Sequence, residues 1–397
     1  MKAYVFSKKG KIELRELPSP VLDPSVPEDA YAAILRPKYL APCSSDAHTV
    51  YAGAGPRRED LILGHEGIAE VLETGTMVKD FRPGDLVAVA AVMPDAPEGH
   101  GHEGSHFSAT KLGRNIDGMW AERFKVPQAD QNLARIPAGV SMEAALMAVD
   151  MMATGFTAAA AAAKNCGRPD GSGQEVLRTE GLLSGLSVLV VGSGAVGLMA
   201  VAAAHSMGAG RIFCIGTDKS RINLDLAVRY GADLYISYRD GHVMYDRAAL
   251  EMKDIIIDPR ANATGDKAVE TVLRLTGGEG VDRILICGGG PDVYIKACDM
   301  LRYGSGTAVN VAYIEGSGTI PLPIFSLGRG MAGKSFVFTL SRGGRSWVEQ
   351  MLAVVREGHL DPGLLVTHHM QGFDSIPEAL EQMYRRPEGL IKIMVEV

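Results

Sequence analysis

A glycine-rich turn in the middle of the chain limits its architecture more strongly than any other feature. The segment Gly192-Ser193-Gly194-Ala195-Val196-Gly197 follows an apolar run at 186–191 and opens a second apolar run at 198–204. The first run is typical of a buried parallel strand and the second of a helix. In this setting the three glycines permit a tight turn, a close approach of pyrophosphate and close packing of helix on strand. We therefore expect a dinucleotide at the N-terminus of this helix, where free N–H groups favour phosphate.

The surrounding pattern predicts an α/β fold with two domains. Strand-like runs alternate with helical stretches at 186–191, 211–215, 234–236, 283–287 and 306–311. This alternation indicates a doubly wound parallel sheet, a Rossmann domain, over 154–339. Residues 1–153 instead contain short strand-like runs separated by proline and glycine, which favours a β-rich, partly barrel-like domain. The tail 340–397, with a helix near 347–357 and a strand near 391–395, is expected to return to that first domain.

Composition excludes several classes of partner. The chain has 397 residues and a net charge of −7, which argues against nucleic acid as a partner. Its five cysteines are widely separated and form no CxxC pair, as expected for a reducing compartment. The N-terminus has no signal-peptide pattern, and the longest apolar run, 188–204, contains the glycine-rich turn. We expect a cytoplasmic protein that neither binds nor crosses a membrane.

Three residues in the first half suit a catalytic metal. They are Cys43 in Ala-Pro-Cys-Ser-Ser-Asp, His65 in Leu-Gly-His-Glu-Gly, and Asp150 in the apolar stretch Ala-Val-Asp-Met-Met. A thiolate, an imidazole and a carboxylate can hold zinc and leave its fourth position open for water or substrate. Taken singly, each has a plainer explanation: a small buried cysteine, a turn histidine, and a helix cap or ion-pair partner. Their coincidence beside a dinucleotide motif favours the zinc site.

These segments together resemble a known family. The runs 41–48, Gly64-His65-Glu66, 150–156 and Gly192–Gly197 are similar to those of zinc-dependent medium-chain alcohol dehydrogenases, and most similar to the bacterial secondary-alcohol enzymes. The similarity spans nearly the whole chain, and it implies a GroES-like catalytic domain. It also implies a homo-oligomer, a tetramer or a dimer, and the run 306–311 resembles the edge strand through which relatives pair.

The resemblance further implies roles for individual residues. Cys43, His65 and Asp150 would bind the zinc, and Glu66 would be an adjustable extra ligand. Ser45 would hydrogen-bond the substrate oxygen, and His48 would be the outer end of a proton relay. The remaining matches are Thr154 against the nicotinamide, Lys392 near the pyrophosphate, Tyr313 in the cleft, and Tyr238 in the coenzyme site.

The chain departs from many relatives at two places. The stretch 91–122 lacks the four cysteines that bind a structural zinc in those relatives, so we expect one catalytic zinc and no structural one. In many NADP-using relatives a small residue and then an arginine follow the second strand, whereas here Gly216 is followed by Thr217, Asp218 and Lys219. A carboxylate accepts hydrogen bonds from the ribose 2′-OH and repels a 2′-phosphate, although Lys219 and Arg221 favour the opposite choice. The sequence therefore favours NAD over NADP.

The function expected from these features is zinc-dependent interconversion of a secondary alcohol and a ketone, by hydride transfer with NAD(P). Two alternatives remain open from the sequence. A dehydrogenase of the same architecture could act on a polyol or an acyloin, or the chain could be a non-catalytic dinucleotide-binding member. Two segments, 164–181 and 245–266, look inserted, and the sequence assigns them no role.

Overall fold

A computed structural model describes residues 1–52, 60–93, 110–114, 116–164, 182–262, 264–314 and 319–397. The chain forms two compact units. The first combines Met1–Ala153 with the tail Ser341–Val397, and the second is the intervening segment Thr154–Leu340.

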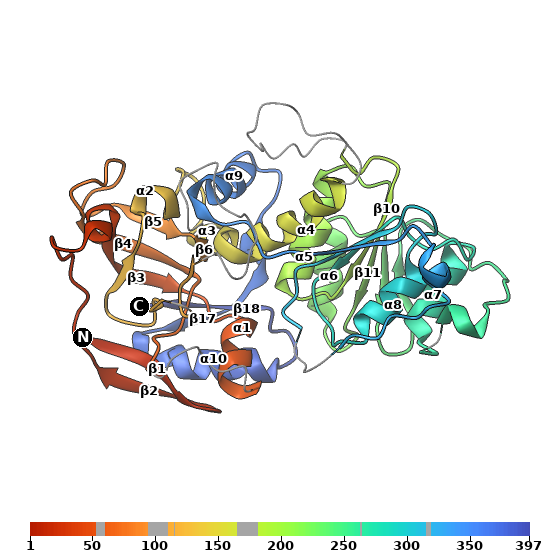
Figure 1. The fold of residues 1–397 in the computed structure, drawn as a ribbon, viewed down its shortest axis with the longest axis horizontal. Coiled ribbons are helices and arrows are strands. Elements are labelled where there is room, and N and C mark those ends of the chain that lie inside the picture. Colours follow the sequence, from red (N-terminus) through yellow and green to blue (C-terminus); the bar gives the residue numbers. More distant parts are fainter. Residues whose placement is uncertain (53–59, 94–109, 115, 165–181, 263, 315–318) are drawn as a thin grey trace. The chain divides into compact units, whose positions relative to one another are not determined.

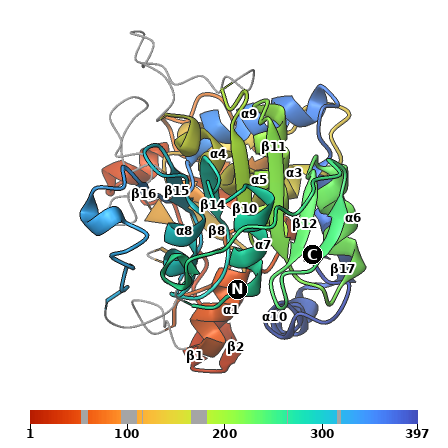
Figure 2. The same cartoon turned by 90° about the vertical axis from the view of Figure 1, so that its right-hand side faces the viewer.

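The unit Thr154–Leu340 is built on a seven-stranded sheet in the order β13-β12-β11-β10-β14-β15-β16. Its strands are β10 (Ser187–Val191), β11 (Arg211–Gly216), β12 (Leu234–Ser237), β13 (Val243–Asp246), β14 (Arg283–Ile286), β15 (Thr307–Asn310) and β16 (Ser335–Phe338). All neighbouring strands are parallel except β13, which is antiparallel to β12. The parallel strands follow the order of a dinucleotide-binding sheet (Figure 2).

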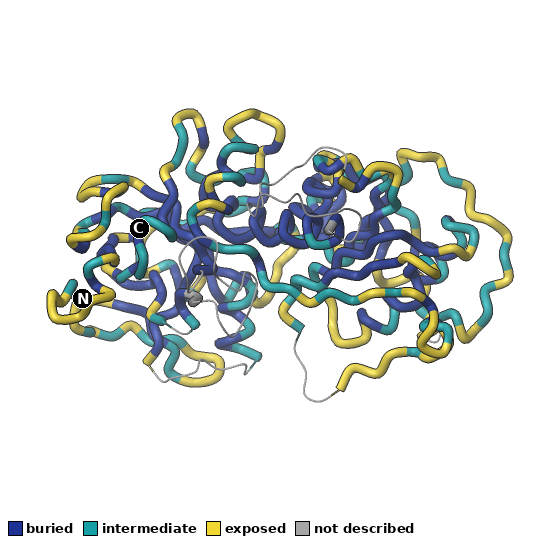
Figure 3. Tube along the Cα trace, turned by 45° about the horizontal axis from the view of Figure 1, so that its top comes forward, coloured by how far each residue is buried: buried dark blue, intermediate teal, exposed yellow. Residues whose placement is uncertain are grey.

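Helices precede or connect these strands. They are α4 (Ala153–Lys164), α5 (Ala195–Ser206), α6 (Arg221–Arg229), α7 (Lys267–Leu275) and α8 (Val293–Met300), with short 3₁₀ turns η4 (Pro259–Asn262) and η5 (Gly328–Gly330). The central strands β10, β11 and β14 are buried at most of their positions, and Figure 3 shows this burial in dark blue. This burial explains why they appear in the sequence as continuous apolar runs. The Asp266 carboxylate starts α7 by accepting hydrogen bonds from the Ala268 and Val269 N–H groups.

The edge of this sheet differs from the prediction. The resemblance predicts that 306–311 is the edge strand through which relatives pair. These residues instead form β15, which lies between β14 and β16. The edge strand is β16, with the sequence Ser-Phe-Val-Phe and no fully buried residue. Because a half-exposed strand of four residues has no continuous apolar run, the sequence pattern did not reveal it.

The other unit is rich in short strands. They are β1 (Lys2–Lys8), β2 (Lys11–Glu16), β3 (Ala33–Leu40), β4 (Gly67–Thr74), β5 (Leu86–Val89), β6 (Val92–Met93), β7 (Thr110–Lys111), β8 (Phe124–Val126), β9 (Leu133–Arg135), β17 (Val366–Gln371) and β18 (Lys392–Glu396). The main sheet runs β17-β18-β3-β4-β5-β9, with β8 also paired to β3. The C-terminal tail therefore completes the N-terminal sheet, because β18 pairs with β3 (Figure 1).

Short helices surround this sheet. They are η1 (Pro27–Tyr31), α1 (Ser44–Ala47), η2 (His48–Ala52), α2 (Ala129–Asn132), α3 (Met142–Met147), η3 (Ala148–Met152), α9 (Gly344–Arg356), η6 (Pro362–Leu365), η7 (Phe373–Ser375) and α10 (Ile376–Arg385). The core joins both segments: Leu40, Val89 and Trp120 belong to the same buried cluster as Ile376 and Ile393 of the tail. This packing fixes the sheet around which the candidate site is built.

The helical run Met142–Ala163 is long and apolar enough to cross a membrane. However, 94% of its most apolar window is buried inside the structure, as expected for a core helix. The run is not uniformly α-helical, because η3 inserts a π-helical turn between α3 and α4. Such turns are frequent at functional sites.

Candidate active site

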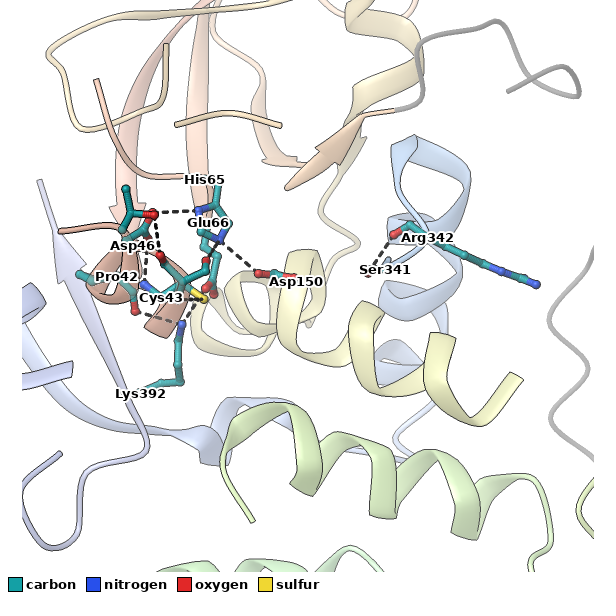
Figure 4. Close-up of polar contacts among 11 residues, drawn as sticks. Pro42, Cys43, Asp46, His65, Glu66, Asp150, Ser341, Arg342 and Lys392 are labelled. Carbon is teal, nitrogen blue, oxygen red and sulfur yellow. Dashed lines mark hydrogen bonds and ion pairs between the residues drawn. The ribbon is translucent and has the colours of Figure 1, made fainter. Parts of the chain in front are cut away.

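Four buried side chains meet at one point of the unit formed by 1–153 and 341–397. One ligand atom from each of Cys43, His65, Glu66 and Asp150 lies within 4.8 Å of the others, and this is the only such group within the described residues. Figure 4 shows the four side chains converging: Cys43 comes from the start of α1, His65 and Glu66 from the segment before β4, and Asp150 from η3. The sequence pattern predicts Cys43, His65 and Asp150 as metal ligands, and the family resemblance adds Glu66. The fold brings all four together.

Cys43 is held at the start of a helix. Its side chain caps α1, with Sγ 3.5 Å from the Ser45 backbone nitrogen. The Asp46 carboxylate in turn accepts a hydrogen bond from the Cys43 backbone N–H, with an N–Oδ2 distance of 3.0 Å. Backbone N–H groups at a helix N-terminus stabilise a thiolate, which is the form that binds a metal.

His65 is oriented by the same aspartate. Its Nδ1 lies 3.1 Å from Asp46 Oδ1, and its Nε2 lies 3.3 Å from Asp150 Oδ2. A histidine that donates Nδ1–H to a carboxylate presents the lone pair of Nε2, as metal-binding histidines commonly do. The preceding Gly64 has a φ of +91°, and a Cβ there would lie 2.2 Å from the Trp120 ring. Only glycine therefore lets the chain turn into His65 at this point.

Two of the predicted residues lie in π-helical turns. Asp150 is in the middle of η3, and His48 is the first residue of η2, directly after α1. Ser45 lies one turn before His48, and its Oγ is 3.4 Å from His65 Nε2. The hydroxyl therefore lies beside the metal group, while His48 is half-buried.

Lys392 lies inside this group. Its Nζ is 2.7 Å from Glu66 Oε1 and 3.1 Å from the Pro42 carbonyl oxygen, and both side chains of the pair are buried. Burial by itself lowers the pKa of Lys392, but the negative charges of Glu66, Cys43 and Asp150 raise it above its ordinary value. The ammonium is the counter-ion of Glu66. The place near the pyrophosphate that the resemblance implies for Lys392 stays a prediction.

The donor set fits zinc. Sulfur, imidazole nitrogen and carboxylate oxygen are its usual ligands, and all four residues are buried. Glu66 Oε2 is buried and has no hydrogen-bond partner among the described residues. Moreover, His65 Nε2 faces the Asp150 carboxylate. When Nδ1 of His65 carries the ring proton, both Nε2 and the carboxylate oxygen offer an electron pair, and no proton lies between them. A cation between these atoms would satisfy them together.

The glycine-rich turn has the geometry that a pyrophosphate needs. Gly192 has a φ of +105°, and a Cβ on Gly197 would lie 1.7 Å from the Gly192 carbonyl oxygen. A Cβ on Gly194 would meet no atom within 4 Å, so space remains open in front of the N-terminus of α5. Ala195 and Val196 form the first turn of that helix, whose free N–H groups suit phosphate.

A buried hydroxyl ties this turn to the neighbouring strands. Ser193 Oγ lies 2.8 Å from the Tyr235 hydroxyl and accepts a hydrogen bond from the Thr217 N–H at 3.2 Å. Asn223 Nδ2 donates to the Ser193 carbonyl oxygen at 2.7 Å. Burial raises the pKa of Tyr235, so its hydroxyl stays protonated. These contacts fix the segment after β11, where Thr217, Asp218 and Lys219 lie.

Comparison with known proteins is consistent with this geometry. A family model for zinc-binding dehydrogenases matches residues 195–357, and one for the alcohol dehydrogenase GroES-like domain matches 29–138. The chain is 36% identical to the NADP-dependent isopropanol dehydrogenase of Thermoanaerobacter brockii, over 100% of this chain and 99% of the relative. It is 37% identical to the enzyme of the same name from Clostridium beijerinckii, over 92% of this chain and 93% of the relative.

The chain belongs to the zinc-dependent medium-chain alcohol dehydrogenases. It is of the bacterial secondary-alcohol type, and the predicted family, fold class and enzyme class are confirmed. Among solved structures, the alcohol dehydrogenase TADH from Thermus sp. ATN1 has a TM-score of 0.76 at 24% identity, covering 100% of both chains. That likeness shows the shared fold. Zinc and a nicotinamide coenzyme are the cofactors of this dehydrogenase family.

The other predicted coenzyme residues belong to the unit 154–340. Tyr238 follows β12 and is exposed, and its backbone N–H bonds the Gly216 carbonyl oxygen at 3.0 Å. Tyr313 is half-exposed and follows β15, and Thr154 is buried near the start of α4. In a parallel sheet, residues that follow the strands share the carboxyl edge, where dinucleotides bind.

Sequence reasoning missed three residues of the dehydrogenase. Asp46 orients His65, and Tyr235 and Asn223 hold the glycine-rich turn. Asp46 did carry a signal, because its position three residues after Cys43 allows a reciprocal helix cap. Residues 94–109 and 115 lie outside the described residues, so the absence of a structural zinc in 91–122 stays a prediction.

Proposed function

We propose that the enzyme interconverts a secondary alcohol and a ketone, using zinc held by Cys43, His65 and Asp150, with Glu66 as an additional ligand. The convergence of these four buried side chains carries the proposal. The isopropanol dehydrogenases to which the chain is similar support the substrate class. Bound zinc supplies Lewis acidity toward the substrate oxygen, and the bound nicotinamide accepts or gives the hydride.

The residues around the metal group move the proton. Ser45 Oγ, 3.4 Å from His65 Nε2, is placed to bond the oxygen of the substrate. Its helical neighbour one turn on is His48, whose two ring nitrogens allow it to accept a proton at one and donate a proton from the other. We assign the proton path to Ser45 and then His48, leading toward solvent. Burial raises the pKa of Glu66, and the Lys392 ammonium opposes that shift and holds the Glu66 side chain in place.

For the coenzyme we propose a preference for NAD, in contrast to the NADP-dependent relatives. Asp218 takes the position of the acidic residue that accepts hydrogen bonds from the ribose hydroxyls. Of the basic residues that argued for NADP, Arg221 pairs with Asp225 at 2.8 Å, and Lys219 is exposed. Gly216 admits no side chain, because a Cβ would lie 2.2 Å from the Tyr235 hydroxyl.

We also propose that the enzyme is a cytoplasmic homo-oligomer. The edge strand β16 and the segment before it expose Ile324, Met331 and Phe338, of which 70%, 79% and 61% of the residue surface is accessible. An unpaired strand edge next to apolar side chains favours pairing with another copy. The oligomeric state follows directly from light scattering.

The proposed activity is tested with a panel of secondary alcohols, polyols and acyloins and with both coenzymes, by following the absorbance of reduced nicotinamide. We expect oxidation of secondary alcohols by the wild type and loss of about 10²-fold or more in Cys43→Ser and Asp150→Asn. Cys298→Ser, which changes a buried cysteine of the other unit, is the control. A clear preference for polyols or acyloins would replace the substrate class. A folded, zinc-loaded protein that oxidises nothing in the panel would favour a non-catalytic dinucleotide-binding role.

A further inference from the structure

An ion pair lies beside the proposed ribose site. Asp218 follows β11 and Arg239 follows β12, and these two strands are parallel neighbours in the sheet. Arg239 Nη2 lies 3.4 Å from Asp218 Oδ1. Both residues therefore occupy the carboxyl edge of the sheet, on the side of β10 where the adenosine end of a dinucleotide is expected.

The two partners differ in how firmly they are held. The segment before Asp218 is fixed, because Thr217 bonds Ser193 Oγ through its N–H and the Tyr235 hydroxyl lies 2.9 Å from its carbonyl oxygen. The Asp218 side chain is 24% exposed, whereas that of Arg239 is 55% exposed. The backbone of Arg239 is anchored at Ser237 Oγ, but its guanidinium reaches into solvent. The arginine can therefore turn toward a bound anion.

The pair lacks hydrogen-bond geometry. Asp218 Oδ1 is buried and accepts no hydrogen bond among the described residues. The carboxylate thus retains capacity to accept from ribose hydroxyls. The guanidinium retains its N–H donors, which suit the oxygens of a phosphate.

We propose that Arg239 determines coenzyme specificity together with Asp218. The arginine offsets the charge of the aspartate and donates to a 2′-phosphate, so the enzyme accepts NADP besides the NAD that Asp218 favours. The inference rests on the proposed coenzyme site and names a second residue in it. No arginine directly follows β11, so Arg239 is the arginine available to a 2′-phosphate. The preference between NAD and NADP should therefore depend on the balance between the charges of Asp218 and Arg239.

Binding of nucleotide fragments to the full chain tests this role without the alcohol reaction. Titration calorimetry would compare adenosine 5′-monophosphate with adenosine 2′,5′-bisphosphate. Arg239→Gln should weaken binding of the bisphosphate about tenfold or more, because a charge-assisted hydrogen bond to the 2′-phosphate is lost. The affinity for the monophosphate, which lacks that phosphate, should change by less than about twofold. Asp218→Asn should strengthen the bisphosphate. The ratio of kcat/KM for NADP and NAD should move in the same directions.

Arg260→Gln is the matched control. Arg260 is also an exposed arginine paired with an aspartate, and it lies in η4, which contacts α8 on the other half of the sheet. It should leave both affinities unchanged. Equal weakening of the two fragments by Arg239→Gln, or no change in either, would overturn the proposal. So would a wild type that binds neither nucleotide. Normal fragment binding with no alcohol oxidation would count against the proposed function alone.

Discussion

Asp46 contacts two residues of the metal group at once. Its Oδ2 accepts from the Cys43 backbone, and its Oδ1 holds His65 Nδ1. Loss of such an outer partner leaves the ligands in place but releases their orientation and lowers the basicity of the imidazole. Asp46 is therefore a positioning residue for the zinc.

Asp46→Asn should lower zinc affinity about 10- to 100-fold while the protein remains folded. Competition with a chromophoric chelator measures the affinity, and circular dichroism monitors the fold. Glu70→Gln removes a carboxylate of the same unit that contacts none of the metal group and should leave the affinity unchanged. Unaltered affinity in Asp46→Asn would show that the aspartate is only a helix cap.

The residues that sequence reasoning found differ in kind from those it missed. Cys43, His65 and Asp150 carry their chemistry in the residue type and its local setting, so they were predictable. Tyr235 acts only because β12 brings its hydroxyl to Ser193, which precedes it by 42 residues. A tyrosine in an apolar strand carries no local sign of that contact.

At the level of elements, two glycines of the turn between β10 and α5 have different roles. One is needed for packing of the chain, and the other leaves space for the ligand. Gly197 must be glycine because its Cβ would clash with backbone, whereas the position of the Gly194 Cβ is open. Gly197→Ala should therefore destabilise the protein, by about 2 kcal/mol or more, since backbone must shift. Gly194→Ala should leave the melting temperature nearly unchanged and weaken nucleotide binding. Thermal unfolding measures the stability of both variants, and calorimetry measures their nucleotide binding. A destabilised Gly194→Ala together with a stable Gly197→Ala would contradict these assignments.

The β3–β4 pair provides a test of pH dependence. Arg36 and Glu70 are cross-strand partners at 2.8 Å, and Lys38 Nζ also lies 3.3 Å from Glu70. Hydrogen bonds from Arg36 and Lys38 hold the pKa of Glu70 below its ordinary value. The stabilisation is therefore complete above the unfolded pKa of about 4.3 and is lost as pH falls through the folded pKa.

Glu70→Gln should cost about 0.2–1 kcal/mol near neutral pH, because the pair is partly exposed. The difference from wild type should shrink below a pH of about 4.3 and then disappear. Urea unfolding at a series of pH values measures it. Glu73→Gln on the same strand, for which the described residues provide no ion pair, should show no such trend. A cost that stays constant into acid would mean that packing, and not charge, is responsible.

Helices and strands were predictable where nearly all of their residues are buried, and deviations from regular geometry were missed. The apolar runs at 186–191 and 211–215 match β10 and β11 within a residue. The π-helical turns η2 and η3 were not predicted, because a single extra residue in a helical turn leaves the apolar pattern almost unchanged. Those two turns carry His48 and Asp150.

At the scale of the whole molecule, the candidate metal site depends on a unit assembled from two distant segments. Asp150 precedes the dinucleotide-binding unit in sequence, while Lys392 follows it and returns on β18 to Glu66. The sequence predicted a returning tail, but the partner of Lys392 depends on how β18 pairs with β3. The metal group is therefore sensitive to the integrity of the whole unit.

One zinc ion, bound by the group around Cys43, should make the enzyme competent for alcohol oxidation. Stepwise addition of zinc to the metal-free protein, with activity and bound metal measured at each step, tests it most directly. Activity should rise in proportion to bound zinc and stop rising at one ion per chain, and Cys43→Ser should lose both the bound zinc and the activity. Full activity in the metal-free protein, or activity that rises only with a second ion, would contradict it.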